Sequence, residues 1–345
     1  MKKVSLFLVV CLIIGVFITG CGSSNGEKDT PAKKEKAQAI TISLAHTAKP
    51  GTAVAVTYDK FKELVEKKSN GQLQVTIYPN GQLGGDGDNV EAVKKGSVDI
   101  GSAGANNMAS FTEIFLFADL PYVWDSIESS YKVWNSEIGD ELKNKVEKEL
   151  GMKALMFVDV GSFRNILNNL NPVKVPADMK GMKIRATASP IEVATLKAWG
   201  GNPTPVAWPE TYMALEQKVV NAEHLQYLWM YTAKHHEAID YITEIGAVQS
   251  VHVALMNKDK FNSLSPELQK VVLDSAKEAQ NYNFEIAPKM VDELKKEIVE
   301  SGVEVYVPTA EELEQWKSSR EEVWKQFEDK VDMDFVKKVI EAQKN

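Results

Sequence analysis

The chain has 345 residues, of which 44% are hydrophobic and 26% are charged. That length can form two domains with separate cores, and the composition excludes an intrinsically disordered protein. Asp and Glu outnumber Lys and Arg by 48 to 40 and no basic stripe runs along the sequence, so nucleic acid is not an expected partner.

The first residues have the pattern of an export signal. Lys2 and Lys3 precede one uninterrupted apolar run, and small residues end that run at Cys21. The run is barely long enough to span a membrane and no basic stop follows it, which favours a signal peptide over a membrane span. A retained signal anchor is the alternative interpretation. Since Cys11 lies inside the signal, no disulfide framework is expected.

The stretch ITGC, which ends at Cys21, resembles the bacterial lipobox. The resemblance implies a lipoprotein signal peptide over residues 1–20, cleavage before Cys21 and diacylation of its thiol. Residues 21–38 lack hydrophobic periodicity and are rich in Gly, Ser, Pro and Lys, the composition of a disordered tether. We therefore expect a folded part that is lipid-anchored to the cell membrane on its extracytoplasmic or periplasmic face.

Strand and helix patterns alternate through the first part of the folded chain. A glycine-rich loop separates a strand from a short helix near its middle. In chain order, the predicted elements are a strand near 40–44, a helix near 54–65, a strand near 73–77, a helix near 90–95 and a strand near 97–104. This alternation favours helices packed on a largely parallel sheet.

The same alternation resumes further along the chain. Continuous apolar strands are predicted at 151–161 and 181–186, and Ser189 is the expected N-cap of the helix that follows. Further helices are predicted from Pro209, from Ser265-Pro266, and after a capping box formed by Thr309 and Glu312. We expect Pro288 to kink or break the long helical stretch that starts at Ser265.

Two α/β blocks, one before and one after about residue 160, predict two lobes with a cleft between them. Ligands of open α/β sheets bind beyond the carboxyl ends of the strands, so the cleft is the expected site.

The sequence offers no recognisable catalytic or metal-binding set. His235 and His236 are adjacent, so on a helix they point about 100° apart and cannot share a metal ion. A calcium loop that starts at Asp86 would need Glu at its twelfth position, where Ser97 stands. The glycines of residues 81–89 do not match the dinucleotide fingerprint either, so a tight structural loop is the favoured interpretation. No cofactor is expected.

Arginine is rare, since only Arg164, Arg185 and Arg320 occur among 40 basic residues. Arginine offers a planar fork that matches a carboxylate with two hydrogen bonds, whereas lysine is a flexible point charge. Arg185 ends a predicted buried strand, where a cleft residue belongs, and Arg164 follows the strand at the block boundary. A structural salt bridge between lobes is the alternative for both, and an exposed ion pair is expected for Arg320.

Four stretches, in order, resemble one known family: 69–100, 117–124, 171–186 and 200–224. From about residue 40 to 330 the chain is similar to the DctP-type solute-binding proteins of tripartite ATP-independent periplasmic (TRAP) transporters. The resemblance implies a two-lobed periplasmic-binding-protein (Venus flytrap) fold of the α/β class with long C-terminal helices. It also implies an organic acid ligand and delivery of that ligand to TRAP membrane permease subunits.

The resemblance assigns roles to particular residues. Arg185 would clamp the ligand carboxylate, Arg164 is a second candidate arginine, and Trp208 would face the body of the ligand. His46, which ends the first strand, and Asn107, which follows the strand SVDIGSAG, match polar ligand contacts. A further match, Glu210, stands at a helix start together with Tyr212, where a capping or packing role is the alternative.

Two departures from the family pattern bear on the ligand. Leu225 stands where the family often has asparagine, and Ala188 stands where its sialic-acid binders have a polar residue. Fewer polar contacts favour a smaller or more apolar carboxylate over a hydroxyl-rich sugar acid.

The sequence therefore predicts a solute-binding receptor rather than an enzyme. Lobe I is expected to comprise residues 39–162 plus about 251–288, and lobe II residues 163–250 plus about 289–345. Two alternatives are a membrane-tethered cleft enzyme, a hydrolase or lyase that would use Glu210 or His46, and the binding protein of an ABC importer.

Overall fold

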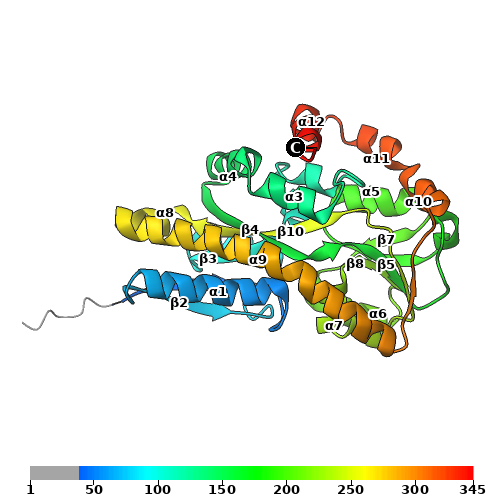
Figure 1. Ribbon diagram of the computed structural model, residues 1–345, viewed down its shortest axis with the longest axis horizontal. Helices are drawn as coiled ribbons and strands as arrows, with labels where there is room; N and C mark the ends of the chain where they lie inside the picture. Colours follow the sequence, from blue (N-terminus) through cyan, green and yellow to red (C-terminus); the bar gives the residue numbers. More distant parts are fainter. Residues whose placement is uncertain (1–38, 345) are drawn as a thin grey trace, which may run out of the picture. The chain divides into compact units, whose positions relative to one another are not determined.

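The computed structural model describes residues 39–344 (Figure 1). The predicted signal peptide, the lipidation site Cys21 and the tether through residue 38 lie outside the described residues. No helix in the described range is both long enough and apolar enough to cross a membrane.

The first sheet has five strands in the order β2-β1-β3-β10-β4. β1 pairs in parallel with β2 and with β3, as predicted, whereas β10 is inserted antiparallel between β3 and β4. The sheet is therefore mixed. Its strands are β1 (Ile40–Ala45), β2 (Leu73–Tyr78), β3 (Ile100–Gly104), β4 (Met152–Phe163) and β10 (Gln249–Asn257).

Helices cover this sheet, and a short 3₁₀ segment follows β3. The helices are α1 (Ala53–Lys68), α2 (Asp86–Lys95), α3 (Ile127–Trp134), α4 (Glu137–Leu150) and α8 (Lys258–Ser263), with 3₁₀ turns at Ala105–Ser110 and Leu116–Asp119. Local signals set their ends. The N-cap of α1 is Thr52, whose side chain accepts from the amide of Ala55, and α4 ends at Gly151 in the left-handed conformation that favours glycine.

The second sheet has six strands in the order β11-β9-β5-β8-β6-β7. The strands are β5 (Asn165–Asn168), β6 (Lys183–Ala186), β7 (Asn202–Pro205), β8 (Ala222–Leu225), β9 (Tyr241–Thr243) and β11 (Glu304–Tyr306). The helices are α5 (Pro190–Ala198), α6 (Trp208–Glu216), α7 (Tyr227–Thr232), α10 (Ala310–Lys317) and α11 (Arg320–Gln326), with 3₁₀ turns at Pro176–Met179 and His235–Glu237. The predicted N-cap Ser189 and the capping box of Thr309 and Glu312 are confirmed.

The chain crosses between the sheets where β4 ends and where β10 begins. β4 ends at Phe163 in the first sheet, β5 begins at Asn165 in the second, and Gln249 of β10 lies opposite Phe163. Asp159 ties the two crossings together, because its Oδ1 accepts from Nε2 of Gln249 at 2.8 Å and its Oδ2 accepts from the amide of Gly161 at 3.1 Å. If the two sheets moved relative to each other, the segments that connect them at the end of β4 and the start of β10 would have to bend.

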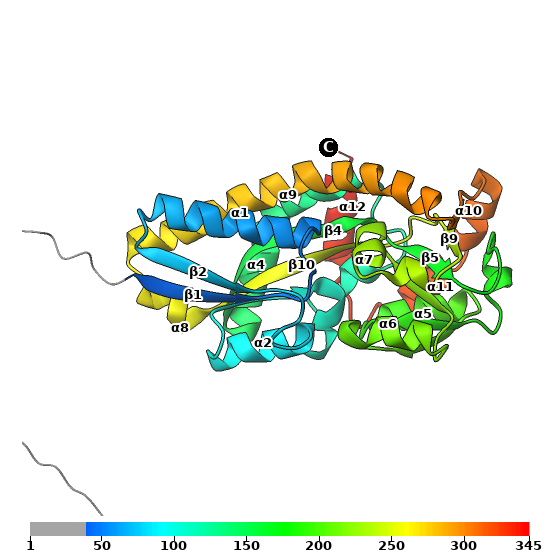
Figure 2. The ribbon, with the colours of Figure 1, turned by 90° about the horizontal axis from the view of Figure 1, so that it is seen from below.

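A third connection is α9 (Pro266–Glu300), a helix of 35 residues. It packs on α1 and β4 and, further along, on α7, and Figure 2 shows it beside α1 at one end. The helix continues through Pro288, so the predicted break does not occur. Buried neighbours of that proline, Ala287 and Val291, anchor the helix on both sides and offset the lost backbone hydrogen bond.

The end of the described chain, α12 (Met333–Ala342), packs on α3. Gln343 fixes it there, because its Oε1 accepts from Oγ of Ser129 at 3.0 Å and its Nε2 donates to the carbonyl of Val123 at 3.0 Å. The sequence assigned residues 289–345 to lobe II. The helix α12 instead lies with elements of residues 39–162.

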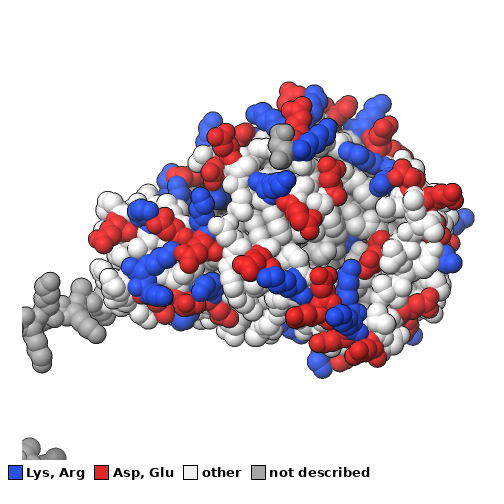
Figure 3. All heavy atoms as spheres, in the orientation of Figure 1, with Lys and Arg blue, Asp and Glu red and all other residues white. Residues whose placement is uncertain are grey.

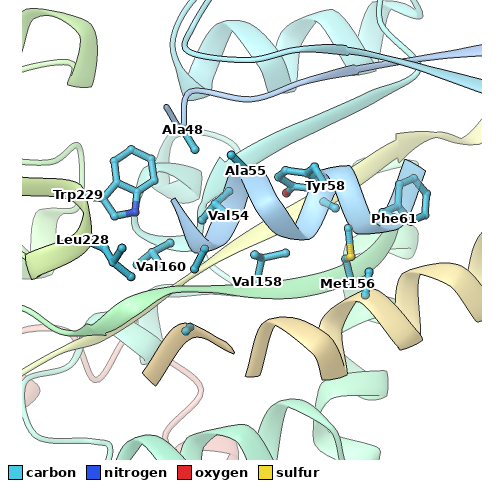
Figure 4. Packing of buried hydrophobic residues seen from close by; sticks show 14 of the residues in the cluster. Ala48, Val54, Ala55, Tyr58, Phe61, Met156, Val158, Val160, Leu228 and Trp229 are labelled. Carbon is cyan, nitrogen blue, oxygen red and sulfur yellow. The ribbon is translucent and has the colours of Figure 1, made fainter. Parts of the chain in front are cut away.

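The core between α1, β4 and α9 holds the first sheet in place (Figure 4). Tyr58 and Phe61 of α1 and Met156 and Val158 of β4 are all buried. Burying a side chain such as Phe61 contributes about 1.5 to 3 kcal/mol. This packing fixes the start of α1 and, with it, the loop that follows β1.

Many charged side chains lie on the surface. On the face in Figure 3, Lys and Arg side chains are interspersed with Asp and Glu side chains. Many form pairs one helical turn apart, such as Lys270 with Asp274 at 2.7 Å. Exposed pairs of this kind contribute less than about 1 kcal/mol each.

Candidate functional site

A small cavity lies between the two sheets, beyond the carboxyl ends of their parallel strands. Polar residues lie within two positions of the ends of four of those strands: Thr47 after β1, Asn106 after β3, Thr187 after β6 and Gln226 after β8. The cavity volume is about 30 Å³, so an organic acid would need the walls to move apart or would extend into adjoining space. The lining residues are Thr47, Asp86, Asn106, Asn107, Val160, Arg164, Arg185, Thr187, Trp208, Leu225, Gln226, Trp229, Ser250 and His252.

Arg185 lies on the cavity wall and is 3% exposed. Its Nε donates to the carbonyl oxygen of Val206 at 3.1 Å, and its guanidinium carbon lies 5.9 Å from the ring centre of Trp208. Within residues 39–344 it forms no ion pair with a carboxylate. Burial lowers the pKa of Arg185, although a guanidinium stays charged in proteins. A buried cation without a partner is unfavourable, and an anion in the cavity would relieve that cost.

Arg164 also lines the cavity, but its charge is matched inside the protein. Its Nη1 lies 2.5 Å from Oε1 of Glu192, and its Nε donates to Oγ of Ser250 at 2.9 Å. Burial alone raises the pKa of Glu192, but the attraction of Arg164 and a hydrogen bond from His224 outweigh it and hold the pKa well below its usual range. The pair therefore stays ionised and holds Arg164 rigidly against the cavity.

Asp86 is a cavity residue that the sequence analysis treated as part of a structural loop. It is the first residue of α2, and its Oδ1 accepts from Oγ1 of Thr47 at 2.9 Å. Its Oδ2 accepts from the amide of Gly104 at 2.9 Å and from Nδ2 of Asn107 at 2.8 Å. No group of potential metal ligands occurs in the described part of the chain. The sequence feature that could have indicated a place in the cavity is that Asp86 lies in the glycine-rich stretch 81–89.

Two further lining residues carry buried N–H groups without a partner among residues 39–344. They are Nε2 of Gln226, which is 2% exposed as a residue, and Nε1 of Trp229. Trp229 packs edge-on against Trp208, with ring centres 4.7 Å apart, and lies 5.2 Å from the ring of His252. The sequence analysis singled out neither residue, and the signal that Gln226 offers is its place directly after a strand.

The other predicted ligand residues divide into two groups. Asn107 and Trp208 line the cavity, and so does Leu225. His46 is not among the lining residues; its ring stacks on Tyr58 with centres 5.1 Å apart. Burial, together with nearby His252, lowers the pKa of His46 to about 4.

Glu210 lies on the first turn of α6 and is exposed, away from the cavity lining. In that position its carboxylate is close to the N-terminus of the helix, where a negative charge is stabilising.

A second, larger space of about 410 Å³ adjoins the cavity. Asp86, Asn107, Arg185 and Trp208 line both. The start of α2, including Asp88 and Glu91, forms one wall of the outer space. The segment from Pro205 to Trp208 forms another. The outer space is therefore a route by which a small molecule could reach Arg185.

Comparison with known proteins identifies relatives with this architecture. The family model for bacterial extracellular solute-binding protein, family 7 (DctP), matches residues 44–330. The 2,3-diketo-L-gulonate-binding periplasmic protein YiaO of Escherichia coli is 31% identical over 246 residues, which cover 71% of this chain and 74% of the relative. The C4-dicarboxylate-binding protein DctB of Bacillus subtilis is 26% identical over 308 residues, 89% of this chain and 87% of the relative.

Solved structures agree in fold. A TRAP periplasmic solute-binding protein from Sulfurospirillum deleyianum with bound succinate has a TM-score of 0.81 and 29% identity, covering 87% of this chain and 97% of that one. A TRAP periplasmic solute-binding protein from Haemophilus influenzae with bound L-gulonate has a TM-score of 0.83 and 26% identity, covering 88% and 99%. The expected two-lobed α/β fold is confirmed. This chain belongs to the DctP family, the bacterial extracellular solute-binding proteins of family 7.

Proposed function

We propose that this chain is the extracytoplasmic receptor of a TRAP-type secondary transporter. It captures an organic acid between its two lobes and delivers it to the membrane permease subunits. The observation that carries the proposal is Arg185, a buried guanidinium on the cavity wall that has no carboxylate partner among residues 39–344. Relatives with bound succinate and with bound L-gulonate support the class of ligand.

Closure between the lobes is the proposed means of capture. The cavity takes Thr47, Asp86 and Asn107 from one side and Arg185 and Trp208 from the other. Neither side alone surrounds a ligand, so a ligand that bridges them favours the closed arrangement. The crossings at the end of β4 and at the start of β10, together with the helix α9, would bend as the lobes separate.

The ligand contacts we propose are Arg185 as the carboxylate clamp, with Arg164, Trp208 and Asn107 beside it. Arg164 is held by Glu192, so its role is to shape the site and to present its remaining N–H groups. His46 and Glu210 do not line the cavity. They would reach a ligand only after a rearrangement of the segment that follows β1 and of the first turn of α6.

We propose in addition that the protein is tied to the membrane through a lipid on Cys21. The lipobox-like ITGC carries this proposal. In a Cys21→Ser variant, mass spectrometry should show a protein without the diacyl group and without cleavage before residue 21, whereas Cys11→Ser, inside the predicted signal, should keep both the lipid and the cleavage. A Cys21→Ser protein that is processed and lipidated like the wild type would contradict the anchor.

The ligand proposal is tested with the purified exported protein. Mass spectrometry of solutes that co-purify from an extract rich in organic acids should identify a carboxylic acid, and calorimetry should then give its affinity. Arg185→Lys keeps the charge but loses the fork, so we expect a loss of binding free energy on the order of 2 to 5 kcal/mol. Arg320→Lys is the matched control, because that arginine lies outside the cavity over the ring of Trp324. Unchanged affinity in Arg185→Lys would contradict the carboxylate clamp.

A further inference from the structure

One of the two arginines that line the cavity is free of an ion pair among the described residues. Three lining residues are acidic or are arginine: Asp86, Arg164 and Arg185. Glu192, directly behind the wall, offsets Arg164 at 2.5 Å. His252 also lines the cavity, but burial lowers its pKa and favours the neutral ring. Arg185 is attracted by Glu192, Glu223 and Asp86, but it is the one lining cation outside an ion pair among the described residues. One ligand carboxylate can pair with it, and a second ligand carboxylate would have no further cation to pair with.

The carboxylate of Asp86 still has capacity to accept a hydrogen bond. An ionised carboxylate has about four lone-pair positions. Within the described residues three donors occupy them: Oγ1 of Thr47 on Oδ1, and the Gly104 amide and Nδ2 of Asn107 on Oδ2. One acceptor position on Oδ1 is left, on a residue that lines the cavity. A ligand group next to it has to donate.

Donors on the opposite side of the cavity also lack partners. Nε1 of Trp229 and Nε2 of Gln226 are buried and unpaired in the described structure. A buried donor without an acceptor costs about 1 to 3 kcal/mol, so each calls for an acceptor oxygen. A hydroxyl group can donate to a carboxylate and accept from an N–H, whereas a carboxylate can only accept and an ammonium group can only donate.

The outer space adds negative charge along the approach. Besides Asp86, it is lined by Asp88 and Glu91, whereas Arg185 is the one basic residue that lines it. Exposed Lys95 pairs with Glu91 at 3.2 Å, so Asp88 contributes the more effective charge. Charge of one sign along an entrance slows the entry of ligands with the same sign, and it does so more for a dianion than for a monoanion.

We infer that the site selects a small hydroxy-monocarboxylate over a dicarboxylate, with Arg185 binding the carboxylate and Asp86 accepting from a hydroxyl. Gln226 and Trp229 donate to the remaining ligand oxygens. The inference rests on the proposed function, because it specifies the class of acid that the same cavity takes. It also separates this chain from those relatives whose names give C4-dicarboxylates.

The test is calorimetry on the solute-free exported protein at neutral pH. The probes are dicarboxylates of three to six carbons and hydroxy-monocarboxylates of the same lengths, among them succinate with 4-hydroxybutanoate, and L-gulonate with adipate. At least one hydroxy-monocarboxylate should bind ten-fold or more tightly than every dicarboxylate of its length. Asp86→Asn should weaken that ligand at least ten-fold and strengthen the matched dicarboxylate. Asp125→Asn, an exposed acid outside the cavity, is the matched control.

Gln226→Leu gives a second measurement if Asp86→Asn does not fold. It should weaken the preferred hydroxy acid about ten-fold. A dicarboxylate that binds as tightly as any hydroxy acid, in a manner that still depends on Arg185, would overturn the inference and leave the proposed receptor intact. Binding of no carboxylate at all would overturn both. A preference for hydroxy acids that survives Asp86→Asn and Gln226→Leu would overturn the roles given to these residues.

Discussion

Nε of Arg185 donates a hydrogen bond of 3.1 Å to the carbonyl oxygen of Val206. This bond uses the one guanidinium nitrogen that is not at the end of the side chain, and it fixes the plane of the group. The terminal nitrogens are left without a carboxylate among residues 39–344. Arg185 is thus oriented in advance of binding, which lowers the entropy lost when an anion arrives.

The same arrangement predicts that Arg185 destabilises the ligand-free protein. Arg185→Met keeps a long side chain but removes a buried charge that has no partner, so the free energy of unfolding should rise by about 1 kcal/mol or more. Chemical denaturation without ligand measures this, and calorimetry should show that carboxylate binding is lost. A variant that is less stable than the wild type would mean that Arg185 has a partner inside the folded protein.

Arg164→Met should have the opposite effect on stability. Removing this cation leaves Glu192, which is buried, without its ion-pair partner, so the free energy of unfolding should fall by about 3 to 5 kcal/mol. Lys270→Met removes an exposed pair with Asp274 and should change it by less than about 1 kcal/mol. Equal effects of the two substitutions in denaturation experiments would contradict the structural role of the buried pair.

Sequence reasoning succeeded where the signal is local. Ser189 was predicted as a cap because it precedes Pro190 at the start of a helical pattern, and Thr309 because Glu312 follows three residues later. Both patterns are short-range, and both caps form. The parallel strands β1, β2 and β3 follow from alternation with helices in the same way. Arg185 was singled out by its rarity and its place after a strand, and the structure puts it on the cavity wall.

The features that were not predicted depend on distant segments. β10 enters the first sheet from far along the chain, and α12 packs on α3. Local sequence patterns predict helices and strands, but they do not predict contacts between such distant segments. The same holds for Asp86 and Gln226, whose meaning depends on what faces them across the cavity. Asp86 in particular is also the first residue of α2. That local role accounts for an acidic residue at this position without reference to the cavity.

Protonation of the buried His46 ring should lower the stability of the protein in mild acid. Its folded pKa is about 4, below the ordinary value of 6.5, so the unfolded chain binds the proton more readily between these values. The contribution is fully present above pH 6.5 and is lost as the pH falls toward 4, by an amount on the order of 3 kcal/mol. Comparing the unfolding free energy of wild type and His46→Gln at pH 4.5 and 7.5 isolates it. A difference between the two proteins that does not change with pH would contradict the shift.

The contribution of Asp119 to stability should depend on pH in the opposite direction. Burial raises its pKa to about 7 from the ordinary 3.8, and its Oδ2 has no hydrogen-bond partner in the described structure. The folded state therefore binds the proton more readily, so the contribution is present below pH 3.8 and is lost as the pH rises through 7. Asp119→Asn should gain stability relative to wild type between pH 5 and pH 8. Denaturation curves at these two pH values are the measurement, and a gain of equal size at both would argue against a protonated Asp119.

A side chain added at position 161, close to the end of β4, should destabilise the protein. Its φ is +104°, and a Cβ built there would lie 2.5 Å from Cδ1 and 2.9 Å from Cβ of Leu228 on α7. Gly161→Ala therefore combines backbone strain with a clash against a buried residue, and it should lower the free energy of unfolding by about 2 kcal/mol or more. Gly151→Ala is the control, because that glycine has φ +66° but nothing within 4 Å of the added carbon, so only the strain of about 1 kcal/mol remains. If the crossing is also the place where the lobes bend, Gly161→Ala should change the rate of ligand release measured by stopped flow, whereas Gly151→Ala should not. Equal stability losses in the two variants would show that α7 moves aside freely, and the crossing would then not constrain the distance between the sheets.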